Sequence, residues 1–219
     1  MPITRLNLRI EPLTHPISSA HCLHHYSPNL TDTSIVAVAG DDFVVIASDS
    51  RLSTGYSIYT RNQSKLFKLS NNSLLEARMQ MYLHEHQKVM STPAISQMLS
   101  TMLYYKRLFP YYILNVLAGF DNDGKGVVYS YDPIGNLEKS KFKAGGSSGA
   151  LLQPVLDNQL GLSNIKEKPE AITLEKALGV VKDAFISATE RDIYTGDSII
   201  LNIITREGIR EEKFELRKD

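Results

Sequence analysis

The chain lacks several features that would assign it to a particular environment or partner. It has one cysteine, Cys22, in 219 residues, which excludes an internal disulfide and fits a reducing compartment. Lys plus Arg (24) equals Asp plus Glu (24), so no basic surplus points to nucleic acid or an anionic membrane. Apolar runs stay well short of the roughly 18 residues that suggest a membrane span, and no apolar core of a secretory signal is found. We therefore expect neither a nucleic-acid nor a membrane partner.

Hydrophobic content of 42% and charged content of 22% are those of a soluble globular protein. The length suits one domain with a continuous core. Residues 1–32 lack a hydrophobic period and hold four prolines, so we expect an N-terminal extension there rather than a packed element. The domain is expected over residues 33–219.

Two motifs superficially suggest metal ions. The cluster His21, Cys22, His24 and His25 in the extension matches no closed zinc pattern, and no second ligand pair follows it. The run from Asp121 to Gly126 resembles the start of a calcium loop, but Lys125 stands where that loop needs an oxygen ligand. A hairpin turn is the better interpretation, and no metal or cofactor is expected.

The stretch from Thr33 to Arg51 organises the rest of the domain. Two short β-branched runs, 33–40 and 43–51, are separated by an acidic turn and predict a β-hairpin. The second run ends with Asp49, Ser50 and Arg51, and Lys65 follows sixteen residues after Asp49, just before the predicted strand 66–69. A threonine hydroxyl, a carboxylate and a lysine on neighbouring strands suit a nucleophile site. They equally suit the remains of one, and a buried Asp49–Lys65 ion pair is the simpler interpretation. Arg51 is expected to form a local salt bridge.

Further periodicities predict alternating blocks of strands and helices. Strands are expected over 56–60, 66–69, 111–120, 126–131, 198–205 and 209–216. Helices are expected over 74–83, after an N-cap at Thr92 with Pro93 at the first helical position, over 150–160 and from Thr173. Two sheets with helices on both outer sides would use all of these apolar faces. The predicted fold class is therefore α+β, as a four-layer α/β/β/α sandwich.

Several local motifs are more specific than this element order. They include the hairpin segments 37–43 and 47–53, Arg107-Leu108-Phe109-Pro110-Tyr111-Tyr112, 123–126 with 129–133, 142–146, 156–159, Ser187-Ala188-Thr189-Glu190-Arg191-Asp192 and 205–210. With these motifs the chain resembles a 20S proteasome β-subunit, a member of the N-terminal nucleophile hydrolase fold. The resemblance covers nearly the whole chain from about Tyr26 onward.

The resemblance implies a site in which the N-terminal threonine position falls on Thr33. The supporting aspartate and lysine fall on Asp49 and Lys65, and a second aspartate on Asp192. Active members release the threonine by cutting after a glycine, and its free amine then serves as the base. Here Asp32 stands in place of that glycine, and an aspartate resists the tight turn that self-cleavage needs.

Other departures concern groups around the threonine. The supporting serine of the glycine turn falls on Gly146, and the serine after the second aspartate falls on Thr195. Between Ser73 and Leu74 the family has a strand, a turn that supplies an oxyanion-hole amide, and the start of a helix. This chain lacks them, so one strand and the start of one helix are expected to be missing. We expect vestigial rather than catalytic residues at Thr33, Asp49, Lys65 and Asp192.

The resemblance thus implies a non-catalytic structural subunit of a ubiquitin- and ATP-dependent protein degradation machine. Its implied partners are the other β-subunits of a heptameric ring, the α-ring and the opposite β-ring, with unfolded polypeptides as substrates of the complex. The implied location is the cytoplasm and nucleus. Two alternatives stay open: an active threonine peptidase with Thr33 as nucleophile, and a truncated isoform that does not assemble.

Overall fold

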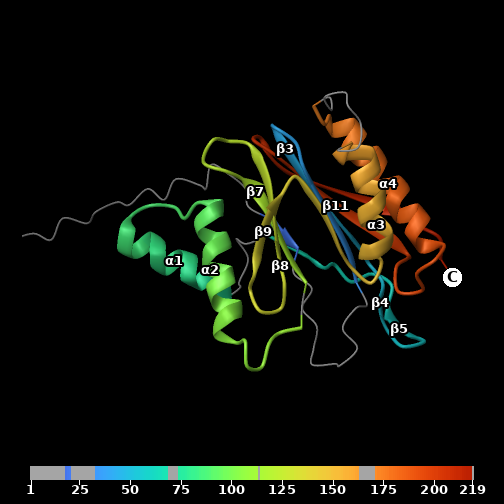
Figure 1. Cartoon of the computed structure of the whole chain (residues 1–219), viewed down its shortest axis with the longest axis horizontal. Helices are drawn as coiled ribbons and strands as arrows, with labels where there is room; N and C mark the ends of the chain where they lie inside the picture. The colour runs from blue at the N-terminus through green and yellow to red at the C-terminus, as the bar shows by residue number, and fades with distance from the viewer. Residues whose placement is uncertain (1–17, 21–32, 69–73, 113, 163–170, 219) are drawn as a thin grey trace, which may run out of the picture.

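The computed structural model describes residues 18–20, 33–68, 74–112, 114–162 and 171–218. Most of its strands belong to two five-stranded antiparallel sheets, with a separate β4–β5 hairpin at one end (Figure 1). Sheet B has the order β10 (Phe142–Gly146), β2 (Ser34–Ala39), β3 (Phe43–Asp49), β11 (Ser198–Thr205), β12 (Gly208–Glu215). The expected hairpin is confirmed as β2 and β3, with Ala39 opposite Val44 at the turn.

Sheet A has the order β6 (Leu66–Lys68), β1 (Ser18–Ala20), β7 (Asn115–Phe120), β8 (Gly126–Tyr131), β9 (Leu137–Ser140). The β7–β8 connection is the hairpin turn expected there: the Asp121 amide donates to Lys125 O, and Gly124 N donates to Asp121 O. The β4–β5 hairpin joins Leu52–Thr54 to Ser57–Thr60.

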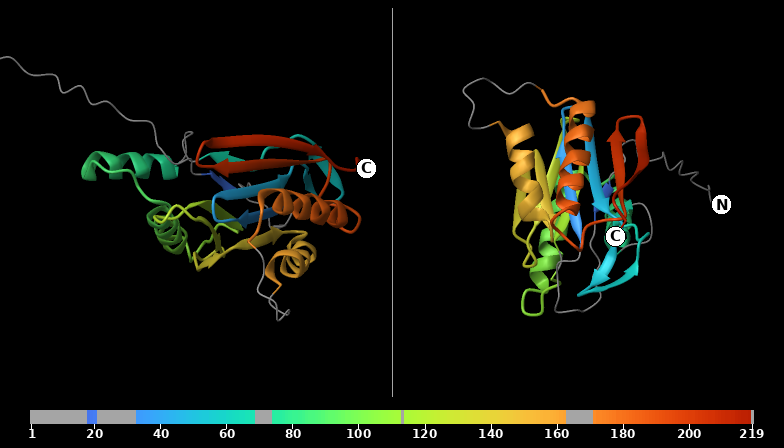
Figure 2. Two further views of the ribbon diagram at one scale, coloured as in Figure 1. Left: turned by 90° about the horizontal axis from the view of Figure 1, so that it is seen from above. Right: turned by 90° about the vertical axis from the view of Figure 1, so that its right-hand side faces the viewer.

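Among the described residues, four α-helices lie outside the sheets (Figures 1 and 2). They are α1 (Leu74–His86), α2 (Thr92–Tyr105), α3 (Gly149–Leu156), which continues as the short π-helix η1 (Asp157–Gly161), and α4 (Leu174–Thr189). The block order expected from the sequence is therefore confirmed. No helix within the described ranges is both long and apolar enough to cross a bilayer.

Three apolar clusters hold the layers together. Residues of β2 and β3 such as Ile35 and Ile46 meet Val116 and Val128 of sheet A between the two sheets. On the outer side of sheet B, residues of β2, β3 and β11 pack on α3 and α4, where Phe185 is fully buried. On the outer side of sheet A, β7 and β8 pack on α2. Because both faces of sheet B are covered, β2 is a continuous buried apolar run rather than an alternating one.

Local signals placed the helix starts to within a residue. Thr173 is the N-cap of α4, and its hydroxyl accepts from the Lys176 amide over 3.4 Å. The assignment of Thr92 as N-cap of α2 is wrong by one position, because Ser91 holds the extended cap conformation and Thr92 is already helical. The sequence did not predict β4, β9 and β10, which are short and only partly buried.

The N-terminal region differs from expectation in one respect. Residues 1–32 were expected to hold no packed element, yet β1 lies inside sheet A and pairs antiparallel with both β6 and β7. That expectation is wrong for these three residues. The polar residues of this segment gave no strand signal, because β1 is held in the sheet by backbone pairing rather than by a period of apolar side chains. The His21–His25 cluster lies outside the described residues.

Candidate functional site

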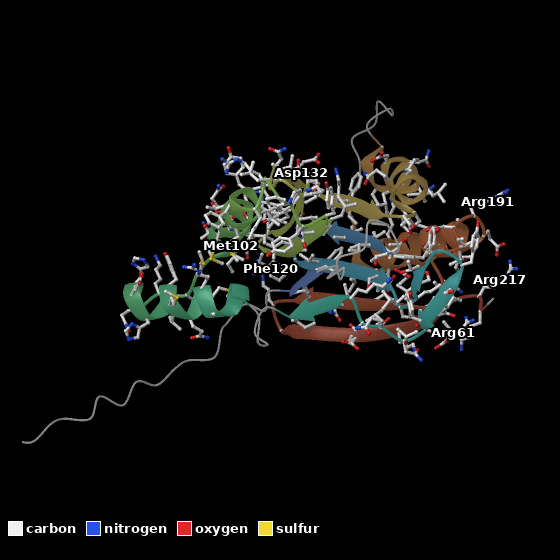
Figure 3. The ribbon with its side chains drawn as sticks, turned by 90° about the horizontal axis from the view of Figure 1, so that it is seen from below. Arg61, Met102, Phe120, Asp132, Arg191 and Arg217 are labelled. Carbon is white, nitrogen blue, oxygen red and sulfur yellow. The ribbon has the colours of Figure 1, made fainter. Side chains whose placement is uncertain are left out.

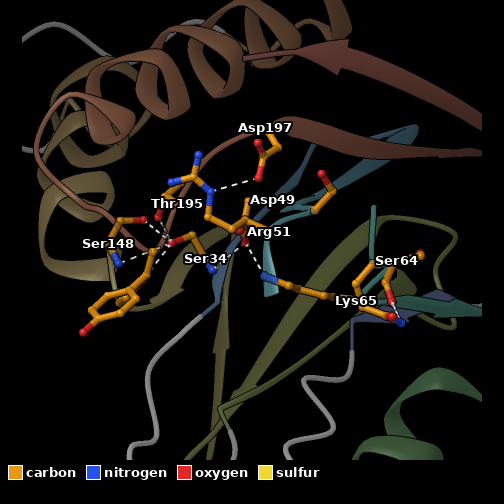
Figure 4. Close-up of polar contacts among 12 residues, drawn as sticks. Ser34, Asp49, Arg51, Ser64, Lys65, Ser148, Thr195 and Asp197 are labelled. Atoms are coloured by element: carbon orange, nitrogen blue, oxygen red, sulfur yellow. Dashed lines mark hydrogen bonds and ion pairs between the residues drawn. The ribbon is translucent and has the colours of Figure 1, made fainter. Parts of the chain in front are cut away.

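Asp49 lies at the centre of the candidate site because β3 ends beside the start of β2. Antiparallel pairing sets Ile35 opposite Ser48, which brings Asp49 next to Ser34 and its neighbour Thr33. The Ser34 amide donates to Asp49 Oδ1 over 2.9 Å, and Lys65 Nζ donates to the same oxygen over 2.8 Å (Figure 4). Lys65 directly precedes β6, so it reaches this carboxylate from the other sheet. The structure thus brings three of the four predicted positions together.

The Asp49–Lys65 ion pair is almost completely removed from solvent, with side-chain exposures of 0% and 4%. Burial raises the pKa of the Asp49 carboxyl, while the charge and hydrogen bond of Lys65 and the Ser34 amide oppose that rise. Asp49 Oδ2 has no hydrogen-bond partner among the described residues. Desolvation offsets much of the attraction in such a pair, so its main effect is to hold β3 against the start of β6.

Asp192 joins the site through hydroxyl groups. It lies in the turn after α4, where Thr195 Oγ1 and Ser147 Oγ each donate to Asp192 Oδ2 over 2.6 Å. Ser34 Oγ lies 2.6 Å from Thr195 Oγ1, and Ser148 Oγ donates to Ser34 Oγ (Figure 4). All four predicted positions therefore lie around the Thr33–Ser34 step.

The hydroxyl groups of Ser148, Ser34 and Thr195 all donate in the same direction, toward Asp192. A hydroxyl has one hydrogen to donate. Because Thr195 uses its hydrogen on Asp192, the contact between Ser34 and Thr195 requires Ser34 Oγ as the donor. Ser148 in turn donates to Ser34, so the chain ends at the Asp192 carboxylate. The 3.3 Å contact between Ser34 and Ser147 then carries no hydrogen, since both hydroxyls have already donated.

Gly146 occupies a position that strongly favours glycine. Its φ is +92°, and a Cβ added there would overlap the carbonyl oxygen of Thr33. The next amide, Ser147 N, donates to that same Thr33 oxygen over 2.9 Å. The sequence placed the loss of a supporting hydroxyl at Gly146, and the structure shows that Ser147 supplies a hydroxyl to Asp192 one residue later.

A second buried ion cluster adjoins the site. Arg51 Nε donates to Asp197 Oδ2 over 2.9 Å, and Arg61 Nη1 donates to Asp197 Oδ1 over 2.6 Å. Burial alone would raise the pKa of the Asp197 carboxyl, but the hydrogen bonds and charges of the two arginines hold it below its usual range. The Arg51 guanidinium packs on Gly196, where a Cβ would stand 2.5 Å from Nη2. The predicted salt bridge of Arg51 is confirmed, but its partner Asp197 is 146 positions away in the sequence rather than a local residue.

Sequence reasoning missed Ser34, Ser147, Ser148 and Asp197. The signal for the serines was present as Gly145-Gly146-Ser147-Ser148, a glycine turn rich in hydroxyls, but nothing in it names the partner. Asp197 has a φ of +67°, which aspartate tolerates better than most residues, and it directly precedes β11. In the part of the chain that the structure describes, no group of three or more His, Cys, Asp and Glu side chains has a metal-binding arrangement.

Comparison with known proteins defines the class to which this fold and site belong. The family model described as "Proteasome subunit" matches residues 31–77 and 72–204. The chain therefore belongs to the proteasome subunit family. The two matches overlap at residues 72–77, so the correspondence with the family is interrupted there.

Individual relatives specify the type of subunit. The chain is 55% identical over 205 residues to "Proteasome subunit beta type-1" of Drosophila melanogaster, covering 85% of this chain and 87% of that protein. It is 44% identical over 205 residues to the protein of the same name from Oryza sativa subsp. japonica, covering 84% and 93%. "Proteasome subunit beta type-6" of Saccharomyces cerevisiae is 35% identical over 212 residues, covering 85% and 88%. The motifs of the sequence had indicated the beta type-1 subunit of eukaryotes, and these relatives confirm that resemblance.

The alignment lengths also show a deletion. Since 85% of 219 residues is fewer than the 205 aligned positions, the alignment with the Drosophila melanogaster protein contains positions that this chain lacks. The family match also divides into two parts, which meet at residues 72–77.

Proposed function

We propose that this chain is a non-catalytic β-subunit of the 20S proteasome core, of the beta type-1 kind, and that it builds the β-ring. The observation that supports the absence of catalysis is the position and burial of Thr33. It follows Asp32 within the chain and is 3% exposed. A threonine nucleophile of this class needs a free α-amine as its base and an open path for a substrate carbonyl.

The residue before Thr33 determines whether that amine is released. Self-cleavage needs a strained turn that presents the preceding carbonyl to the threonine hydroxyl, and glycine adopts such turns most readily. Asp32 is a poor substitute. With the Thr33 nitrogen retained in an amide bond, Asp49 and Lys65 serve as an ion pair between sheets, which their burial supports.

We further assign the fold to the four-layer N-terminal nucleophile hydrolase type. The two sheets with α2 on one outer side and α3 and α4 on the other support that assignment. The deletion is proposed to remove one strand, a turn and the start of a helix between Ser73 and Leu74. The lost turn would have supplied an oxyanion-hole amide, and losing one such donor costs on the order of 10²–10³ in rate.

Two separated apolar surfaces support assembly into a ring. The end of α2 and the loop after it expose Tyr105, Leu108 and Phe109 by 81%, 79% and 84%. The β4–β5 hairpin exposes Tyr56 and Tyr59 by 100% and 71%. In Figure 1 both surfaces lie along the lower edge of the molecule, at separate positions across its width. A head-to-tail ring needs two different complementary surfaces on each subunit, and exposed aromatic residues are enriched in such interfaces.

The proposed domain organisation and location follow the same assignment. Residues 1–32 form the N-terminal arm and 33–219 the β-type domain. The proposed partners are neighbouring β-subunits in a heptameric ring, the α-ring and the opposite β-ring, in the cytoplasm and nucleus. Unfolded polypeptides are substrates of the complex. Arg61, Arg191 and Arg217 lie at one end of the molecule in Figure 3. That end offers a charged surface for contacts with the neighbouring subunits.

An active threonine peptidase is the second candidate, and one observation favours it. Thr33, Asp49, Lys65 and Asp192 all lie around one backbone step, linked by the hydrogen bonds described above. In that case Thr33 Oγ would attack the peptide carbonyl and its free amine would take the hydroxyl proton.

Isolation of the assembled particle tests these candidates. We expect the chain to co-sediment with a ring-sized particle, to retain Thr33 in an amide bond by intact mass, and to resist an electrophilic threonine probe. A mature chain that begins at Thr33 and reacts with the probe would establish the peptidase instead. A chain found only outside the particle would establish the isoform that does not assemble.

A further inference from the structure

The strand β1 occupies an internal position in sheet A. Its three residues, Ser18–Ala20, lie between β6 and β7 rather than at an edge. Ser18, Ser19 and Ala20 stand opposite Lys68, Phe67 and Leu66 on one side. On the other side they stand opposite Ala118, Leu117 and Val116. β1 is therefore the only element that joins β6 to the rest of sheet A within the described residues.

Without β1, the space between β6 and β7 would expose backbone groups in a buried region. Leu66 is 8% exposed, and Val116, Leu117 and Ala118 are 3%, 0% and 0% exposed. Backbone N–H and C=O groups in such surroundings need hydrogen-bond partners. An extended segment of about three residues can supply them on both sides, whatever its side chains, because the pairing is made by the main chain.

The order of elements explains why this space needs a strand from elsewhere. Along the chain, β6 ends at Lys68 and α1 begins at Leu74, which leaves only residues 69–73 between them. The family match is interrupted at residues 72–77, and the relatives' alignment contains positions that this chain lacks. A strand between β6 and β7 is therefore supplied from outside this region of the sequence.

We propose that the space between β6 and β7 is a strand-accepting site and that residues 18–20 of this chain's own arm are its occupant. The site recognises an extended polypeptide by backbone pairing. The connection is long enough, because residues 21–32 can span roughly 40 Å when extended, whereas packed sheets lie about 10 Å apart. The proposal goes beyond the proposed function, since it assigns the arm a structural role that neither assembly nor catalysis requires.

One consequence concerns the candidate site. Lys65 directly precedes β6, and β6 reaches the rest of its sheet through β1. The arm thereby positions the lysine that binds Asp49.

A second consequence concerns processing. A cut between residues 20 and 33 leaves the arm bound to the domain, because the cut does not remove the pairing of β1.

Amide hydrogen exchange on the full-length chain tests the proposal. We compare wild type with Ser19→Pro, since proline removes an N–H and is excluded from central strands. Leu13→Pro, in the arm but outside β1, is the matched control. Exchange at residues 66–68 and 116–118 should accelerate by roughly a hundredfold in Ser19→Pro and stay unchanged in the control. Equal protection in Ser19→Pro and wild type would overturn the proposal.

A cleavage experiment tests retention of the arm. A protease recognition sequence is inserted after His25 in the full-length chain, which is purified intact and then cut. On gel filtration the wild-type arm should elute with the domain, and the Ser19→Pro arm should separate from it. Loss of the wild-type arm as readily as the Ser19→Pro arm contradicts the proposal. Protection at residues 66–68 that appears only at concentrations where two copies associate contradicts the assignment to the chain's own arm. Neither readout depends on ring assembly or peptidase activity.

Discussion

Lys65 Nζ donates to Asp49 Oδ1 over 2.8 Å across the two sheets, with both side chains at most 4% exposed. Removing one partner from such a pair leaves an uncompensated buried charge, whereas replacing both leaves none. The pair therefore defines how this region responds to substitution and to pH.

Lys65→Met is expected to lower the free energy of unfolding by about 3–5 kcal/mol. Asp49→Asn with Lys65→Met should cost less than the sum of the two single changes. Lys139→Met removes an ion pair of similar length, 2.7 Å, from an exposed lysine, and should cost at most about 1 kcal/mol. Equilibrium denaturation at pH 7 measures all of these, and additive single effects would contradict the coupling.

The pH dependence of Lys65→Met provides a further check on the same pair. Without Lys65, burial raises the pKa of the Asp49 carboxyl without opposition from the ammonium. A carboxyl with a raised pKa in the folded state binds protons more tightly than in the unfolded state, so stability falls as pH rises above about 3.9. Lys65→Met should therefore be less destabilised at pH 4 than at pH 7.

Gly146→Ala is expected to destabilise the protein by at least about 1–3 kcal/mol, because it combines a positive φ with overlap of the Thr33 carbonyl. Gly145→Ala is the matched control, since a Cβ at that position meets nothing within 4 Å. Thermal melts of the two variants measure the difference. Similar melting temperatures would show that the turn relaxes around the added methyl group.

The cluster of Asp197 with Arg51 and Arg61 should stabilise the protein above the pKa of an unfolded aspartate, about 3.9. The pKa of Asp197 is lowered in the folded state, so this contribution is lost as pH falls from about 3.9 through the folded value. Asp197→Asn keeps a side chain that tolerates the φ of +67°. Equilibrium denaturation at a series of pH values should show the stability difference between wild type and Asp197→Asn shrinking toward low pH.

Ser34→Ala removes the centre of the hydroxyl chain and leaves the Ser148 hydrogen without this acceptor. We expect a loss of about 1–3 kcal/mol in unfolding free energy. Ser187→Ala, which removes an exposed hydroxyl bound to Asp183 O, should cost less than about 0.5 kcal/mol. Denaturant titration of both variants measures the contrast, and equal costs would mean that the chain contributes no more than a surface hydroxyl.

Elements with a strong period or a clear cap followed from sequence. The hairpin of β2 and β3, the strands β8 and β11 and the start of α4 next to Thr173 were predicted nearly to the residue, because local propensity and burial agree there. The short strands β4, β9 and β10 were missed, since three to five partly buried residues carry no period. Thr33, Asp49 and Lys65 were first identified from their places on neighbouring predicted strands, whereas Asp192 came from the family resemblance alone. The structure brings all four together.

By itself, the sequence determined the alternating blocks of strands and helices, the aspartate at residue 32 that directly precedes Thr33, and a lysine able to neutralise Asp49. Those properties depend on residue type and order alone. Only the tertiary structure decided which groups meet: Ser147 rather than residue 146 binds Asp192, Asp197 lies between two arginines, and β1 pairs inside sheet A. The reason is physical. These contacts join residues far apart in the chain. Backbone pairing between strands, unlike a period of apolar side chains, does not require particular residue types and so cannot be read from the sequence.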